Sequence, residues 1–391
     1  MLSTPENLSE RAIVILADLV AFDTTSRHSN LDLIAYVEAA LSALGVASQR
    51  IGNADGSKAN LIATLGPAVE GGVVLSGHTD VVPVDGQPWT SDPFKLTERD
   101  GRLYGRGSAD MKGFLALALA AAPDFIAGNL NRPVHLAFSY DEEVGCLGAR
   151  DLVAEIVRKV PRPGIVLVGE PTSMEVVSGH KGISVYRVCV RGREAHSSLT
   201  HLGVSANMAA ARLMGRLADL AEELEYKADT ASPFHPPHAT LTIGVVHGGT
   251  AGNILARECE FLFDLRCPPG LDPDAILAPF RAQVEQVDSA LKARAPETGV
   301  TFERLASTPP LTPEHDGAAE RLVRSLAGDN GPARAVAYAA EAGQFQQAGY
   351  STVICGPGSI EQAHQADEYV DVAQMQRGAA FMARLREALA T

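Results

Sequence analysis

The chain has 391 residues, two to three times the length of a typical domain of about 100–200 residues, so we expect two domains. Its composition, with 46% hydrophobic and 20% charged residues, is that of a folded globular protein and excludes disordered and collagen-like chains. The formal net charge of −14 repels phosphate backbones and anionic lipid, which argues against nucleic acid as a partner.

The cysteines and the apolar segments bear on the compartment. Five cysteines are scattered without a CxxC pair, which argues against a disulfide framework or a structural zinc site and favours reduced, buried thiols in a cytoplasmic protein. The first residues are polar and acidic, and the longest other apolar stretch, 114–122, is far shorter than the ~20 residues that span a bilayer. We therefore expect neither a secretory signal nor a membrane anchor.

Apolar periodicity along most of the chain predicts alternating helices and strands. Helical spacing occurs over 8–22, 31–44, 111–127, 147–159 and 373–389. Continuous apolar runs that suit strands buried on both faces lie at 72–77, 133–140, 164–170 and 351–358. This alternation predicts an α/β fold with a mostly parallel sheet flanked by helices.

The pattern changes between 181 and 306. Partly alternating strands begin near 183, 239, 258 and 300, with helices over 205–225 and 272–294. Four strands and two helices predict an α+β sandwich inserted into the larger domain. The predicted organisation is a catalytic domain formed by 1–180 and 307–391, interrupted by an inserted lid or dimerisation domain over 181–306.

Carboxylates and histidines follow the predicted strands of the larger domain. Because ligands bind at the carboxyl ends of parallel strands, these side chains should converge on one crevice. They are His78 and Asp80, Asp141 to Glu143, Glu170 and His364, with Asp110 just before a helix. Taken singly, each could instead be a turn former or a helix cap.

The combination of residue types indicates a metal centre. Two histidines with several carboxylates and no cysteine select a borderline divalent ion such as Zn²⁺, Co²⁺ or Mn²⁺. Five candidate ligands exceed the three that are normal for one catalytic zinc ion, so two ions sharing a bridging carboxylate are the economical arrangement. Residues two apart in an extended segment face the same way, so Asp80 is placed to orient the His78 ring.

Six motifs in order along nearly the whole chain resemble the M20 family of metal-dependent amidohydrolases and exopeptidases. They are SGHTDVVPVDGQPWTSDPF (76–94), LYGRGSADMKG (103–113), DEEVGCLGAR (141–150), GEPT (169–172), AHSS (195–198) and GPGSIEQAHQADEY (356–369). Within the family the chain is most similar to the acetylornithine deacetylases. The resemblance implies a zinc-exopeptidase-like catalytic domain carrying a lid domain.

The resemblance also implies roles at the predicted centre. Asp110 would bridge two ions, either Zn²⁺ or Co²⁺, with His78 and Glu170 at one position and Glu143 and His364 at the other. Glu142 would be the general base, since an unligated carboxylate can take a proton from an attacking water and later protonate the leaving amine. The alternative is that Glu142 is only a solvated neighbour of the ligand Glu143.

In the inserted domain the resemblance implies oxyanion stabilisation by a histidine and an asparagine contributed across a homodimer interface. His196 and Asn253 match those positions, and preorganised donors suit developing negative charge. The alternatives are a capping histidine and a turn asparagine. The dimer would form through the inserted domain.

Further residues are expected to bind substrate. Arg266 resembles the family's clamp for the substrate α-carboxylate, although a surface arginine at a strand end fits as well. Gly356 and Gly358 would let the backbone approach the substrate, or would only make the turn. Glu341 lies where relatives carry an acidic residue, and we expect it to meet a cationic substrate side chain.

The expected function is hydrolysis of N-acetyl-L-ornithine to ornithine and acetate, a step of arginine biosynthesis. One alternative is the same chemistry on another N-acyl amino acid or dipeptide, such as succinyl-diaminopimelate or acetylcitrulline. A second is a binding homologue that has lost its metal. A serine hydrolase is excluded because the chain has no GxSxG elbow.

Overall fold

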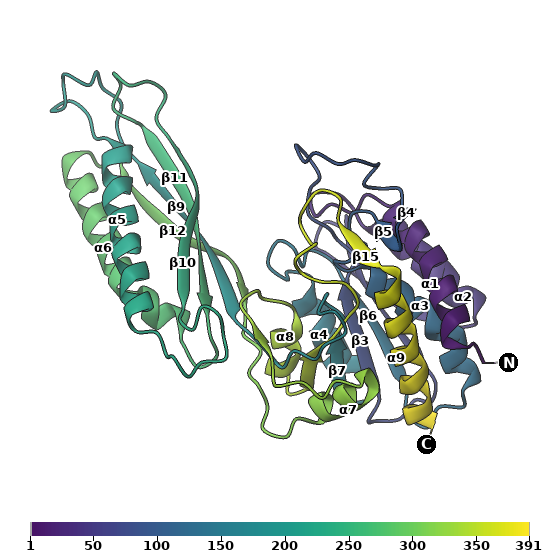
Figure 1. Cartoon of the computed structure of the whole chain (residues 1–391). Helices are drawn as coiled ribbons and strands as arrows, with labels where there is room; N and C mark the ends of the chain where they lie inside the picture. Colours follow the sequence, from purple (N-terminus) through teal and green to yellow (C-terminus); the bar gives the residue numbers. More distant parts are fainter. Residues whose placement is uncertain (1, 391) are drawn as a thin grey trace. The chain divides into compact units, whose positions relative to one another are not determined.

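The computed structural model describes residues 2–390, which divide into two compact units (Figure 1). Unit 1 contains the chain up to Gly179, Leu311–Ala335 and the chain from Ala340. Unit 2 contains His180–Pro310 and Val336–Ala339.

Unit 1 is built on a mixed sheet of six strands in the order β1-β2-β6-β3-β7-β14. The strands are β1 (Ser48–Gly52), β2 (Ala59–Leu65), β3 (Val73–His78), β6 (Val134–Ser139), β7 (Ile165–Val168) and β14 (Ser351–Ile354). The last four named run parallel, whereas β1 and β2 are antiparallel to their neighbours. The α/β class with a mostly parallel sheet is confirmed.

Helices cover both faces of this sheet. Unit 1 contains α1 (Pro5–Val20), α2 (Leu31–Ala43), α3 (Lys112–Ala127), α4 (Ala149–Lys159), α7 (Ala318–Ala327), α8 (Ala342–Gln347) and α9 (Val372–Ala390). From the central strand β3, the chain steps to β6 on one side and later to β7 on the other. Right-handed crossovers therefore place α3 and α4 on opposite faces. Helices α1 and α9 pack on α3, and α8 packs on α4.

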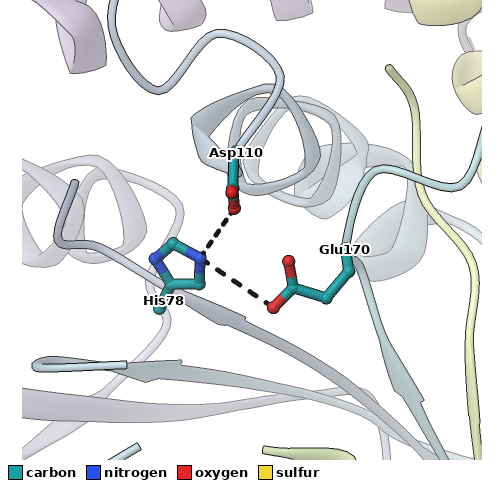
Figure 2. A group of neighbouring side chains, drawn as sticks. All are labelled: His78, Asp110 and Glu170. Carbon is teal, nitrogen blue, oxygen red and sulfur yellow. Dashed lines mark hydrogen bonds and ion pairs between the residues drawn. The ribbon is translucent and has the colours of Figure 1, made fainter. Parts of the chain in front are cut away.

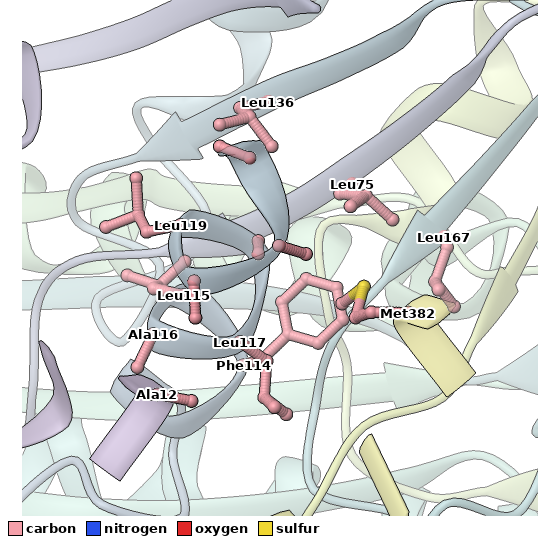
Figure 3. Close-up of a cluster of buried hydrophobic side chains, with 14 of the residues drawn as sticks. Ala12, Leu75, Phe114, Leu115, Ala116, Leu117, Leu119, Leu136, Leu167 and Met382 are labelled. Atoms are coloured by element: carbon pink, nitrogen blue, oxygen red, sulfur yellow. The ribbon is translucent and has the colours of Figure 1, made fainter. Parts of the chain in front are cut away.

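The core of unit 1 lies around α3, whose sequence is apolar on every side. Leu115 and Leu119 contact a layer that includes Leu75 of β3 and Leu136 of β6, and all four side chains are buried (Figure 3). A helix that is apolar all round is stable only when neighbouring elements cover it completely. Burial of α3 therefore fixes the start of this helix, where Asp110 lies, against the sheet.

Smaller ladders complete the fold. A three-stranded sheet has the order β15-β5-β4, formed by Tyr369–Asp371, Arg102–Tyr104 and Thr97–Arg99. Strand β13 (Ala335–Val336) pairs with β8 (Gly179–His180). Within residues 2–390, no helix combines the length and apolarity needed to cross a membrane.

Unit 2 is an antiparallel sheet of four strands, ordered β10-β11-β9-β12, with two helices on one face (Figure 1). Its elements are β9 (Gly182–Arg191), α5 (Ala206–Tyr226), β10 (Thr240–Gly248), β11 (Glu258–Cys267), α6 (Pro273–Arg294) and β12 (Gly299–Thr308). Burial alternates along β9 and β11, as expected for strands with one covered face. The buried aromatic residues of its core are Tyr186, Phe261, Phe263 and Phe280.

An ion pair between helices provides a test of stability in unit 1. Asp124 of α3 accepts hydrogen bonds from Arg11 Nη2 (2.7 Å) and from the Ser3 amide (2.8 Å). Burial opposes ionisation, but these bonds lower the pKa of Asp124 below its ordinary value of 3.8. The contribution of the ionised Asp124 to the free energy of unfolding is therefore complete above pH 3.8, the ordinary pKa. It is lost as the pH falls through the lower pKa of the folded state.

We expect Asp124→Asn to lower the free energy of unfolding by about 1–2 kcal/mol at pH 7, because the amide nitrogen cannot accept from Arg11. Urea unfolding from pH 7 downward should show the difference from wild type shrinking below about pH 4. Glu10→Gln, at an exposed position of α1, is the control. A difference that stays constant with pH would mean that packing, not charge, is responsible.

Candidate metal centre

His78, the last residue of β3, is held in one orientation at the carboxyl edge of the sheet. Its Nδ1 donates to the carbonyl oxygen of Asp80 at 2.9 Å. Because a carbonyl only accepts, Nδ1 carries the hydrogen and Nε2 faces the acidic cluster. That nitrogen lies 3.0 Å from Asp110 Oδ1 and 3.9 Å from Glu170 Oε1 (Figure 2).

Asp110 directs its two carboxylate oxygens at two different histidines. Oδ1 faces His78, whereas Oδ2 lies 3.3 Å from His364 Nε2. His364 Nε2 also lies 3.0 Å from Glu143 Oε2. The side chains therefore form two groups that could each hold an ion, namely His78, Asp110, Glu170 and Asp110, Glu143, His364. Only Asp110 belongs to both, which is the geometry of a bridging ligand.

The electrostatics of the cluster favour bound positive charge. Burial raises the pKa of Glu170 well above its usual range and that of Glu143 to about 7, and the charge of Asp110 adds to both shifts. Hydrogen bonds to Asp110 and Glu143 raise the pKa of His364 to about 10. Carboxylates that are so costly to ionise together are stabilised by cations between them.

The donor set fits divalent ions. Imidazole nitrogens with carboxylate oxygens are ligands of Zn²⁺, Co²⁺ and Mn²⁺. Glu170 Oε1 is buried without a hydrogen-bond partner, and His78 Nε2 is aimed into the same space. A buried orphan oxygen beside an oriented imidazole nitrogen is the arrangement that a cation satisfies.

Asp80 contacts the His78 ring and also binds neighbouring segments. Its carbonyl fixes the ring, while its Oδ1 lies 3.7 Å from the same nitrogen. The carboxylate also accepts the Ser26 hydroxyl (2.7 Å) and the amides of Glu142 (3.0 Å) and Glu143 (3.3 Å). Asp80 thus ties the end of β3 to the segment that follows β6.

Glu142 stands beside the two groups without belonging to either. Its Oε1 accepts the thiol of Cys146 at 3.1 Å. Burial raises the pKa of Glu142 to about 8, and the charges of Glu143 and Asp110 contribute. A carboxyl with such a raised proton affinity, next to a cation site, has the properties of a general base that can also return the proton.

The predicted residues His196, Asn253 and Arg266 belong to unit 2. The segments of the first two are adjacent, because the Ser197 amide donates to the Asn253 carbonyl at 2.9 Å. The His196 side chain is exposed, with Nδ1 2.8 Å from the Ser198 hydroxyl. Arg266 lies on β11 with its Nε 3.6 Å from Asp264. Unit 2 therefore brings the histidine and asparagine segments together.

Glu341 is buried beside strands β3 and β6. Its side chain is fully buried, and its oxygens accept the hydroxyls of Ser76 (2.6 Å) and Ser139 (2.7 Å). Burial raises its pKa. In this structure the carboxylate therefore lies between β3 and β6, bound to a serine of each strand. Its contact with a cationic substrate side chain stays a prediction.

Gly356 and Gly358 are explained by contacts within the protein. A Cβ at Gly356 would lie 2.0 Å from the carbonyl oxygen of Gly169, next to Glu170. Gly358 has φ of +85°, and its Cβ would lie 3.0 Å from that of Ala109, next to Asp110. Both glycines therefore let the segment after β14 approach segments that carry candidate ligands. Their contact with substrate stays a prediction.

Sequence reasoning does not identify two residues that support the cluster. Ser26 binds Asp80 as described, and Lys58 pairs with Asp141 and with the Ser26 carbonyl. Neither residue lies in a motif or at a predicted strand end. Only the folded arrangement reveals their contacts.

Comparison with known proteins identifies the family of this chain. The model of peptidase family M20/M25/M40 matches residues 74–388. An acetylornithine deacetylase of Myxococcus xanthus is 38% identical over 94% of this chain and 95% of its own length. One from Proteus mirabilis (strain HI4320) is 36% identical over 96% of this chain and 95% of its own length.

The fold also matches solved structures. An M20 family metallo-carboxypeptidase from Sulfolobus solfataricus superimposes with a TM-score of 0.77 at 17% identity, covering 97% of this chain and 99% of its own. The family match begins within β3 and includes the parallel strands β6, β7 and β14, the inserted sheet and the residues clustered around Asp110. The chain belongs to peptidase family M20/M25/M40 and is a hydrolase of that family.

Proposed function

We propose that this protein is a dinuclear metal-dependent deacylase that hydrolyses N-acetyl-L-ornithine to L-ornithine and acetate. The observation that carries the proposal is the division of the Asp110 oxygens between His78 and His364, with Glu142 unligated beside them. Glu170 would complete one ion position and Glu143 the other. Zn²⁺ or Co²⁺ bound there would supply Lewis acidity to polarise an amide carbonyl.

In the proposed reaction Glu142 moves one proton. Its carboxylate takes a proton from the attacking water as the water oxygen bonds to the acetyl carbon. The same carboxyl then gives that proton to the amide nitrogen as the carbon–nitrogen bond breaks, which releases the amine of ornithine and acetic acid. The acid then loses the second proton of the water, so at neutral pH the products are acetate and the ammonium form of ornithine. Burial raises the pKa of Glu142, which favours its holding the proton for the leaving nitrogen, whereas ions bound beside it would favour the carboxylate form that the first transfer needs.

Residues of unit 2 would bind the reacting amide and the substrate carboxylate. We assign His196 and Asn253 as donors to the oxyanion that develops on the carbonyl, and Arg266 as the partner of the α-carboxylate. The adjacency of the Ser197 and Asn253 segments supports a shared role for the first two. Gly356 and Gly358 would leave the neighbouring backbone open to the substrate.

The substrate assignment is supported by the relatives, which are named acetylornithine deacetylases and are 38% and 36% identical. It is tested by amine release from N-acetyl-L-ornithine, with N-acetylcitrulline, N-acetylmethionine, succinyl-diaminopimelate and a dipeptide as competitors. We expect a metal-dependent preference for acetylornithine after EDTA treatment and readdition of Zn²⁺ or Co²⁺. Activity on another member of the panel alone would keep the chemistry and overturn the substrate.

A binding homologue without metal is the alternative of another class. Metal analysis of the purified protein distinguishes it: the proposed enzyme should contain up to two divalent ions per chain, whereas a metal-free homologue should contain none even after incubation with Zn²⁺. The orphan Glu170 oxygen and the oriented His78 nitrogen favour the enzyme.

We further propose a cytoplasmic homodimer formed through unit 2. Within residues 2–390 none of the five cysteines forms a disulfide, in keeping with a reducing compartment. Strand β10 is an edge of its sheet, and its residue Val246 is 50% exposed. Met208, on the adjoining helix α5, is 68% exposed. An unpaired edge with apolar neighbours favours association with another chain. Light scattering after gel filtration should give twice the chain mass of 41.2 kDa.

A further inference from the structure

A fully buried glutamate holds the backbone that presents Asp110. The side chain of Glu368 is 1% exposed, and both of its oxygens are occupied. Oε1 accepts the amides of Ala109 and Asp110, each at 3.0 Å. Oε2 accepts the Gly107 amide at 3.0 Å and Arg106 Nη1 at 2.7 Å. The carboxylate thus receives four hydrogen bonds from consecutive parts of one loop.

Glu368 also belongs to the segment that carries His364. The two residues are four positions apart, between β14 and β15, whereas Asp110 lies 258 residues away from Glu368. The Glu368 carbonyl accepts a further hydrogen bond from the Gly105 amide at 2.9 Å. One residue therefore ties the loop of Asp110 to the loop of His364, and these two side chains are the ones that meet at 3.3 Å.

A second connection runs in parallel through Gln87. Arg106 Nη2 donates to Gln87 Oε1, and Gln87 Nε2 donates to the carbonyl oxygen of His364 at 2.9 Å. The Arg106 guanidinium carbon lies 5.0 Å from the centre of the Trp89 ring. The indole N–H of Trp89 donates to the same Gln87 oxygen at 3.0 Å. Arg106 is thus held on both sides, by Glu368 and by Gln87.

A buried ion pair of this kind carries a large desolvation cost and is weak evidence for stability alone. Its hydrogen bonds, however, converge on the residues next to a candidate bridging ligand. Groups that orient metal ligands typically change metal affinity by about 10–100-fold when they are removed. The hydrogen bonds of Glu368 are therefore placed to position the Asp110 side chain.

We propose that Glu368, assisted by Arg106 and Gln87, is a positioning residue that sets Asp110 and His364 at the separation required by the ion they share. This inference rests on the proposed metal centre. Because these hydrogen bonds run between protein groups only, we expect them to organise the loop of Asp110 before an ion binds.

The test is Glu368→Gln, which keeps the side-chain length but replaces one carboxylate oxygen by an NH2 group. That group cannot accept the hydrogen bonds that the backbone amides and Arg106 donate. Metal-free protein is titrated with Co²⁺ and followed by calorimetry and by the visible absorption of the bound ion. We expect affinity for one of two ions to fall by about 10-fold or more, with an altered absorption spectrum. Glu361→Gln, an exposed residue of the same segment, should match wild type.

The outcomes separate the hypotheses. Wild type that binds no pair of ions would overturn the metal centre itself. Two unchanged affinities and an unchanged spectrum in Glu368→Gln, accompanied only by lower thermal stability, would overturn the positioning role. Glu368→Asp, which keeps the charge but is too short to reach both sets of donors, should lie between wild type and the glutamine variant.

A measurement on wild type covers the case in which the variants do not fold. Amide hydrogen exchange in EDTA should show the segment 105–110 already protected, because the Gly107, Ala109 and Asp110 amides donate to Glu368. Protection that arises only after ions are added would overturn organisation before binding.

Discussion

Glu142→Gln is expected to lower kcat by about 10²–10⁴-fold while both divalent ions remain bound, since it removes proton transfer without removing a ligand. Glu142 belongs to neither ion group, and its oxygen contacts the Cys146 thiol. The amide is nearly isosteric, so the fold should be retained. Single-turnover rates with acetylornithine, together with metal analysis of the same sample, provide the measurement.

The neighbouring residue is the control for this prediction. Glu143 Oε2 lies 3.0 Å from His364, so Glu143→Gln should weaken one ion and lower activity through metal loss. Excess Zn²⁺ or Co²⁺ should then restore part of the Glu143→Gln activity and none of the Glu142→Gln activity. Glu142→Gln with a wild-type kcat would contradict the general-base assignment.

Asp110→Asn is expected to weaken both ions and to abolish measurable turnover. The asparagine side chain has one oxygen where the carboxylate has two. It therefore cannot supply an oxygen both to an ion beside His78 and to an ion beside His364. The loss of affinity should exceed the about 10–100-fold typical of groups that only orient ligands. Calorimetric titration of the metal-free variant with Zn²⁺ measures it.

Asp371→Asn is the matched control for Asp110→Asn. It removes an exposed carboxylate, 3.3 Å from Arg102, whose ion pair contributes about 0–1 kcal/mol. Both ions and full activity should be retained in this control. Circular dichroism in EDTA should show that the asparagine variant at 110 is folded. Binding of two ions with wild-type affinity by that variant would exclude a bridging Asp110.

Elements with a strong local signal could be predicted from the sequence. Helix α3 was expected at 111–127 and spans Lys112–Ala127, because its apolar residues can be buried only by neighbouring elements. In contrast, β1 (Ser48–Gly52) and β2 (Ala59–Leu65) are not predicted. Strand β1 is short and partly exposed, and β2 becomes a strand by pairing with β6, far along the chain.

The candidate ligands were predictable for a topological reason. Strands that run parallel end at the same edge of a sheet, so residues placed after β3, β6 and β7 must come together there. Residue types then select the class of ion. Topology and residue type thus gave His78, Glu170 and the run from Asp141 to Glu143 as candidates without coordinates, and the resemblance to the family selected Glu143 within that run.

Tertiary structure alone decided which contacts each side chain makes. Asp110 divides its oxygens between two histidines, Glu341 is buried against Ser76 and Ser139, and Glu368 binds a loop 258 residues away. These outcomes depend on distances between segments remote in sequence and on which oxygens remain free after nearby donors are satisfied. The sequence by itself determined the family and the ligand types, whereas burial and long-range hydrogen bonding decided the part that each carboxylate plays.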